Sequence, residues 1–266
     1  MASPEGLIRV LSHANSQLKR TAFEVQEYAR LLVAAFRCTF TPPVYRYDIV
    51  EQFEAIGVQS LTVVLLTGFF TGAVLALQSG LTLDQFGARP VVGRLVSASM
   101  VKELGPVLTG LMLTGRVGSG IAAELGSMVV TDQINALRAL GTDPVRKLVV
   151  PRLLAGFFMA PVLTVVSDFV GIVGGWIVAR YQLQVASGLY WSSILEGLYM
   201  QDIWMGLIKP FVLGFVIVSV ACYIGLRTSG GTQGVGKATT QAVVAGSVGV
   251  IAADFFLTRI LISLMY

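Results

Sequence analysis

Residues 203–226 read IWMGLIKPFVLGFVIVSVACYIGL, an apolar run whose only charged residue, Lys209, stands next to Pro210. A helix of roughly 20 apolar residues is long enough to cross the hydrocarbon core of a bilayer. Four other apolar blocks occur at about 56–77, 92–113, 149–179 and 242–265. Because a helix satisfies its own backbone hydrogen bonds, the sequence predicts an all-α integral membrane protein with five transmembrane helices.

The composition agrees with this class. Of 266 residues, 55% are hydrophobic and 13% are charged, with a mean hydropathy of +0.75, whereas soluble domains have about a quarter charged residues. The net charge of +4 comes from basic residues between the apolar blocks, a pattern that orients membrane proteins and does not indicate nucleic-acid binding. Cys38 and Cys222 imply no disulfide framework. The single histidine, His13, excludes multi-imidazole metal centres and serine-histidine dyads inside the membrane.

The N-terminal region has a different pattern. Between Leu7 and Phe36 apolar residues recur at helical spacing with basic residues between them. This predicts an amphipathic helix that lies in the headgroup plane of the membrane, or alternatively packs on a partner protein. Thr41-Pro42-Pro43 should end the helix. Residues 1–55 are therefore expected to be a cytoplasmic interfacial helix and lead-in that is retained, and residues 56–266 the five-span domain.

Basic residues indicate the orientation. Lysine and arginine are concentrated in the N-terminal region, the 124–150 loop and the 227–241 loop, which the positive-inside rule assigns to the cytoplasm. Five spans then place the C-terminus outside. The residues on the predicted cytoplasmic side are Arg9, Lys19, Arg20, Arg30, Arg37, Arg46, Arg116, Arg138, Arg146, Lys147, Arg152, Arg227 and Lys237, and those opposite or near the last helix end are Arg89, Arg94, Arg180 and Arg259.

The 124–144 loop between the second and third spans predicts a short helix near 128–141. Thr131 can cap its start, and Gly141 with Asp143-Pro144 can end it. A helix with one apolar face is suited to a groove on another protein, although the apolar stripe could equally pack on the transmembrane bundle. The apolar stripe consists of Val130, Ile134, Leu137 and Leu140, and the polar positions are Asp132, Gln133, Asn135 and Arg138.

Several motifs resemble the MlaE/YrbE permease family, the membrane subunits of MCE-associated ABC transporters. They are KELGPVLTG (102–110), GRVGSGIAAELG (115–126), DQINAL (132–137), the stretch from Asp143-Pro144 to Pro151-Arg152, GVGKATTQAVV (234–244) and ADFF (253–256). The similarity covers nearly all of the chain beyond its first forty or so residues. Asp132 and Lys237 stand where several relatives have Glu and Arg, and both changes keep the charge.

The resemblance implies a homodimeric inner-membrane permease that moves phospholipids and contributes to outer-membrane lipid asymmetry. It also implies three kinds of partner: an MlaF-like ABC ATPase, an MlaB-like STAS-domain accessory and an MlaD-like hexameric MCE protein on the outer face. The ATPase is expected to dock on the loop helix through Asp132, Gln133, Ile134, Leu137 and Arg138. The permease itself would bind no cofactor, with ATP and Mg²⁺ held by the ATPase.

The residues themselves agree with a separate ATPase. The segment from Gly231 to Lys237 resembles a phosphate-binding loop, but Ala238 stands where Ser or Thr should bind Mg²⁺, and no strand precedes the segment. Gly68 and Gly72 in the first span have the spacing that lets two helices approach closely, although a glycine-rich chain can show it by chance.

Charged residues within the spans are the candidates for a lipid cavity. Each costs about 3 kcal/mol or more unless it is paired or hydrated, so these side chains should face the dimer interior. Pro106 frees the carbonyl of Lys102 and permits a bend there. We predict cavity positions for Lys102, Glu103, Lys209 and Asp254, with Lys209 meeting a lipid phosphate. Alternatively, the lysines snorkel to the interface while Asp168 and Asp254 pair with neighbouring helices.

Two other function classes remain open. An ion-coupled secondary transporter could use Glu103, Asp168 and Asp254 as a relay, but five spans do not divide into two inverted repeats. An intramembrane enzyme would need a nucleophile with its base, which the sequence does not provide.

Overall fold

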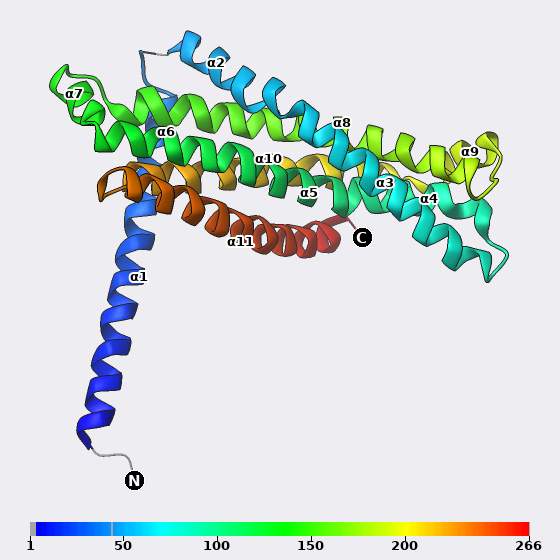
Figure 1. The fold of residues 1–266 in the computed structure, drawn as a ribbon, viewed down its shortest axis with the longest axis horizontal. Coiled ribbons are helices and arrows are strands. Elements are labelled where there is room, and N and C mark those ends of the chain that lie inside the picture. Colours follow the sequence, from blue (N-terminus) through cyan, green and yellow to red (C-terminus); the bar gives the residue numbers. More distant parts are fainter. Residues whose placement is uncertain (1–3, 44, 266) are drawn as a thin grey trace.

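The chain forms a bundle of long helices crossed at one end by its first helix (Figure 1). The computed structural model describes residues 4–43 and 45–265, and within 4–21 it describes the side chain of Lys19 alone. Every regular element of these residues is helical, which confirms the all-α class.

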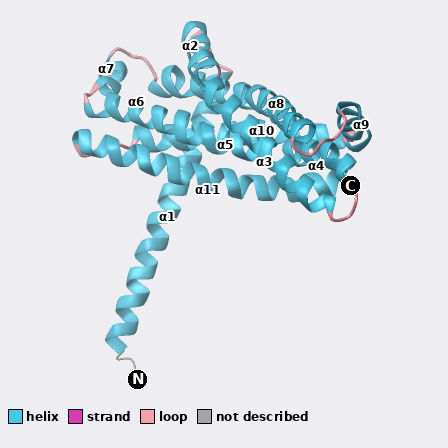
Figure 2. Ribbon diagram, turned by 45° about the vertical axis from the view of Figure 1, so that its right-hand side comes forward, coloured by secondary structure: helices cyan, strands magenta, loops and turns pink. Residues whose placement is uncertain are grey.

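The N-terminal helix α1 (Pro4–Thr39) ends just before Thr41-Pro42-Pro43, where the sequence predicts its end. Its C-terminal part packs at one end of the bundle, and its N-terminal part projects away from the other helices in both Figure 1 and Figure 2. His13 and two residues of the predicted basic face, Arg9 and Arg20, lie outside the described side chains, and the amphipathic character of the helix stays a prediction.

Helices α2 (Arg46–Ile56) and α3 (Leu61–Asp84) follow, joined by the 3₁₀ turn Val58–Ser60. The remaining long helices are α8 (Val150–Tyr181), α10 (Met200–Leu226) and α11 (Gly231–Met265). Within the described residues four helical stretches are long and apolar enough to cross a membrane: Arg46–Asp84, Val145–Tyr181, Met200–Leu226 and Gly231–Met265. They contain four of the five predicted spans.

The predicted second span, 92–113, is divided. Helices α4 (Val92–Ser99), α5 (Gly105–Leu113) and α6 (Ser119–Val130) are joined by π-helical turns at Met100–Leu104 and Thr114–Gly118. A third π-helical turn, Val145–Val149, precedes α8. Single π turns in α-helices occur frequently at functional sites. The count of five spans therefore stays a prediction.

Close glycine contacts join α3 to α8. A Cβ atom on Gly72 would lie only 1.8 Å from the carbonyl oxygen of Gly171, and one on Gly68 would lie 2.7 Å from that of Ser167. No side chain fits between backbones at these distances. The predicted close approach at Gly68 and Gly72 is confirmed, and chance occurrence does not explain the pair.

Two hydrophobic clusters form the core. The larger joins α3, α5, α6, α8, α10 and α11, and the smaller joins α3, α4 and the end of α8 to α9 (Ser187–Gly197). Tyr190 of α9 is fully buried and donates a hydrogen bond of 3.0 Å to the carbonyl of Ile172. Helix α9 was not predicted from the sequence.

The two ends of the bundle differ. One end, here called the α7 end, carries α7 (Gln133–Ala139), the α1–α2 connection and the α10–α11 connection, while α9 and the start of α4 lie at the other end (Figure 1). The segments assigned to the cytoplasm by their basic residues thus share one end of the bundle.

Candidate functional site

Three charged side chains from three elements meet inside the bundle. The ammonium nitrogen of Lys209 on α10 lies 2.8 Å from Oε2 of Glu103 and 3.2 Å from Oδ1 of Asp254 on α11. It also donates to the carbonyl oxygen of Lys102 at 2.7 Å. We call Glu103, Lys209 and Asp254 the charge cluster. Its formal charge is negative, because two carboxylates face one ammonium.

The local backbone explains how Lys209 reaches this position. Pro106 has no N–H to offer the carbonyl of Lys102, and the π-helical turn before it displaces the chain further. Lys209 supplies the missing donor. A Cβ on Gly206 would lie 2.2 Å from the carbonyl oxygen of Val101, so α10 approaches this turn closely enough for the contact.

The ammonium of Lys102 is directed elsewhere. It lies 2.7 Å from Oδ1 of Asp202, whose side chain is almost completely buried and whose Oδ2 accepts from the backbone N–H of Tyr199 at the start of α10. Consecutive residues, Lys102 and Glu103, therefore bind different partners. Of the four predicted cavity residues, Lys102 contributes only its carbonyl oxygen to the charge cluster.

The charge cluster reaches the surface of the chain on one side. Lys209 is completely buried, whereas the side chains of Asp254 and Glu103 are 14% and 42% exposed. The hydroxyl of Thr258 donates to Glu103 at 3.3 Å. Because the ammonium nitrogen is completely buried and has three oxygens within 3.2 Å, a lipid phosphate would have to displace one of them to reach it. Contact between Lys209 and a lipid stays a prediction.

Asp168 lies apart from the charge cluster. Its side chain is buried on α8, Oδ1 has no hydrogen-bond partner, and this atom occupies the space beside Gly105. Burying a carboxyl oxygen without a hydrogen-bond partner is costly. The predicted pairing of Asp168 with a neighbouring helix is absent for Oδ1.

The loop helix α7 is shorter than the expected range 128–141, because residues up to Val130 belong to α6. Asp132, with a φ of 58°, stands at its start, and its carboxylate accepts from the side chain of Asn135 at 2.9 Å. The prediction that Thr131 caps this helix is wrong. Its hydroxyl donates to the backbone carbonyl of Ser127 in α6, because the chain turns only after Thr131.

The predicted end of α7 is confirmed at Gly141, which has a φ of 75°. The N–H of Gly141 donates to the carbonyl of Arg138, and that of Thr142 donates to the carbonyl of Leu137. These two bonds form a Schellman motif, in which glycine readily takes the left-handed position.

The alternative that the apolar stripe packs on its own chain holds for two of its residues, and docking on a partner stays a prediction. Ile134 is buried and Leu137 half-buried, so these two side chains pack on their own chain. Leu140 is 81% exposed, as a binding surface would be. Asp132, Gln133 and Arg138 are also exposed. The surface that α7 presents is therefore polar with one exposed leucine.

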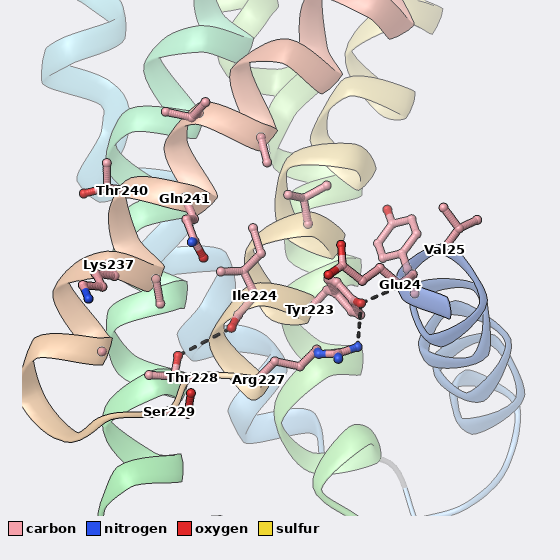
Figure 3. A pocket seen from close by; sticks show the side chains of 16 residues that line it. Glu24, Val25, Tyr223, Ile224, Arg227, Thr228, Ser229, Lys237, Thr240 and Gln241 are labelled. Atoms are coloured by element: carbon pink, nitrogen blue, oxygen red, sulfur yellow. Dashed lines mark hydrogen bonds between the residues drawn. The ribbon is translucent and has the colours of Figure 1, made fainter. Parts of the chain in front are cut away.

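A cleft of about 920 Å³ lies at the α7 end between α1, the last turns of α10 and the first turns of α11 (Figure 3). Tyr28 of α1 shares a hydrogen bond of 2.7 Å with Ser219 and contacts the ring of Tyr223 edge to face. Burial raises the pKa of Tyr28. Gly231 to Lys237 form the first turns of α11 and not a phosphate-binding loop, which agrees with the sequence argument against a nucleotide site there.

Sequence reasoning missed the contacts of the tyrosines and of Arg116. Arg116 donates from the second π-helical turn to Ser60 at 2.7 Å, to Gln59 at 3.1 Å and to the carbonyl of Ala55 at 3.2 Å. These bonds join the second π-helical turn to the end of α2 and to the 3₁₀ turn before α3. Because these partners lie 56 to 61 residues away in the sequence, no short sequence pattern could predict the contacts.

Comparison with known proteins identifies the family of this chain. The family model described as Permease MlaE matches residues 49–260. A probable ABC transporter permease protein of Rickettsia conorii is 42% identical over 93% of this chain and 96% of its own length. The intermembrane phospholipid transport system permease protein MlaE of Haemophilus influenzae is 38% identical over 80% of this chain and 82% of its own.

A plant relative extends the comparison. The chloroplastic protein TRIGALACTOSYLDIACYLGLYCEROL 1 of Arabidopsis thaliana is 36% identical over 78% of this chain and 59% of its own length. With its apolar helices and a family match that covers all but the last six residues of the predicted five-helix domain, this multi-pass membrane protein belongs to the MlaE permease family.

Proposed function

We propose that this chain is the permease subunit of an ABC transporter that moves phospholipids between the inner membrane and an MCE partner outside it, and that this transport contributes to outer-membrane lipid asymmetry. The name of the Haemophilus influenzae relative, an intermembrane phospholipid transport permease, supports the substrate class. Two copies of the chain would form the membrane unit, with ATP and Mg²⁺ bound by a separate ATPase. A STAS-domain protein is a further expected partner.

The observation that carries this proposal is α7. It is a short, separately capped helix at the end of the bundle, and it presents Asp132, Gln133, Arg138 and Leu140 to solvent. An ATPase that drives transport needs an exposed surface of this kind, because it must bind the permease outside the membrane in order to move its helices. Ile134 is buried and Leu137 half-buried, so force on α7 passes to α6, which it contacts, and along the chain to the π-helical turn before α8.

A phospholipid cargo requires a transport path that is shielded from water. Moving two acyl chains of about fifteen methylenes each through water would cost about 24 kcal/mol at about 0.8 kcal/mol per methylene. The path must stay shielded from water, which favours direct release into a greasy MCE tunnel. We place the path beside the exposed carboxylate of Glu103, between two copies of the chain.

We further propose the topology that the basic residues indicate. Residues 92–130 would form the second of five spans, interrupted by its two π-helical turns, with the N-terminus and α7 in the cytoplasm and the C-terminus in the periplasm. Residues 1–55 would be the interfacial helix and lead-in.

Docking on α7 can be tested by co-purification of the ATPase with the permease. We expect Leu140→Asp and Arg138→Glu to lower the ATPase content of the purified complex severalfold without lowering the melting temperature of the permease, since both side chains are exposed. Arg46→Glu, an exposed change on α2, is the matched control. Ile134→Ala should instead destabilise the permease. Full ATPase content in the Leu140→Asp/Arg138→Glu double variant would refute the docking role.

The ion-coupled transporter remains a second candidate because of Asp168. A buried carboxyl group with an unpaired oxygen could bind and release a proton. Transport measured with ATP present and the proton gradient collapsed separates the candidates: the ABC permease keeps its activity, and the ion-coupled transporter loses it.

A further inference from the structure

The cleft between α1, α10 and α11 is distinct from the charge cluster. None of its lining residues belongs to the charge cluster or to α7. Its volume of about 920 Å³ lies within the size range of about 300 to 1,000 Å³ that is typical of ligand-binding sites. Figure 3 shows that side chains from all three helices face this space.

One side of the cleft is apolar. Val220 and Ile224 line it from α10, and Val244 and Ala245 line it from α11. Val25 of α1, which is 62% exposed, and Val244, which is 59% exposed, stand at its opening. A groove lined in this way at the end of transmembrane helices is suited to a hydrocarbon chain.

The other side of the cleft carries a positively charged side chain, Arg227, that is held in place by Tyr223. The guanidinium of Arg227 lies 5.2 Å from the ring centre of Tyr223 and donates to the hydroxyl of that tyrosine at 2.7 Å. The hydroxyl donates in turn to the carbonyl of Glu24 at 3.0 Å, which fixes the tyrosine against α1. Arg227 forms no ion pair within the described part of the chain, and of its five N–H donors only one is used by these contacts.

We propose that this cleft binds a glycerophospholipid of the leaflet at the α7 end, with its phosphate on Arg227 and one acyl chain along Val220 and Val244. A planar guanidinium held beside the hydroxyl and ring of Tyr223 matches a phosphate group in charge and geometry. The first turn of α11 adds positive potential on the same side. The recognised group is the phosphodiester, which zwitterionic and acidic phospholipids share. The site requires only that the chain lies in a membrane and does not depend on the proposed transport.

The experiment uses the full-length permease in nanodiscs that contain a phospholipid with a photoreactive group in one acyl chain. After irradiation, mass spectrometry should locate the label on peptides containing Val220 to Ile224 and Val244 to Ala245. We expect Arg227→Gln to lower this labelling about tenfold, the effect of losing one charge-assisted hydrogen bond. Arg46→Gln, a matched loss of an exposed cation from α2, should leave it unchanged. Ala245→Trp should fill the cleft and lower labelling while keeping Arg227.

Three probes separate the sources of the phosphate. Phosphatidylethanolamine and phosphatidylglycerol probes should label alike, and a diacylglycerol probe should label much less. Equal labelling by diacylglycerol would overturn the proposal, as would full labelling of Arg227→Gln. Displacement of the label by glycerol phosphate would assign the cleft to a soluble phosphate ester instead. An efficient disulfide between two copies of Ala245→Cys, with no lipid label, would show that a second copy fills it.

Discussion

Replacing Lys209 by methionine should destabilise the permease strongly. The change leaves Glu103 and Asp254 without their cation and the carbonyl of Lys102 without its donor. Removing one partner of a buried ion pair costs about 3 to 5 kcal/mol. Because Glu103 is 42% exposed, water screens part of the repulsion, and we expect a cost of about 3 kcal/mol. For a chain of this size that loss lowers the melting temperature by about 6 to 12 °C.

The assay is thermal unfolding of the purified permease followed by circular dichroism. Arg259→Met is the matched control, since Arg259 is an exposed cation of α11 with no ion pair among the described residues, and it should change stability by less than about 0.5 kcal/mol. Adding Asp254→Asn to Lys209→Met should recover part of the loss because one unpaired carboxylate is removed. A melting temperature equal to that of the control, or a double variant no more stable than Lys209→Met, would refute this account of the charge cluster.

Two predictions use the same assay. Gly72→Ala should destabilise the chain by about 3 kcal/mol, because its Cβ would lie 1.8 Å from the carbonyl oxygen of Gly171. The control Gly115→Ala, whose Cβ meets open space, should be neutral or stabilising by up to about 1 kcal/mol. Equal effects of the two changes would contradict the packing of α3 on α8. Asp168→Asn should raise stability by about 1 kcal/mol, because it removes a buried ionisable group with an unpaired oxygen. A lower melting temperature in Asp168→Asn would show that the carboxyl group has a partner that matters.

The apolar blocks predicted the positions of the long helices well and their ends less well. The third and fourth blocks, 149–179 and 203–226, agree with α8 and α10 to within a few residues. In contrast, α11 begins at Gly231, eleven residues before the fifth block. Hydropathy marks only the part of a helix that favours hydrocarbon, while a helix continues into polar sequence wherever packing supports it. Helix α9 was missed because it is short and of mixed polarity.

The π-helical turns show a second limit of prediction from the sequence. Pro106 predicts a disturbed backbone, and the disturbance lies directly before it, at Met100–Leu104. Thr114–Gly118 and Val145–Val149 contain no proline, although Pro144 precedes the latter. Whether such a turn is α or π depends on contacts with other helices, such as those of Arg116 with Gln59 and Ser60. Local sequence does not contain that information.

The pairing of residues in the charge cluster is the feature that the sequence predicts least, because it depends on tertiary structure. The cost of ionised groups in hydrocarbon predicts that Lys102, Glu103, Lys209 and Asp254 need partners, but it does not say which. In a regular α-helix adjacent side chains point about 100° apart, and here the π-helical turn sends Lys102 to Asp202 and Glu103 to Lys209. Both lysines are thereby neutralised within the chain. If lipid enters beside Glu103, its phosphate first meets a carboxylate, so binding requires movement of α10 relative to this turn, which is the movement that a motor acting through α7 could supply.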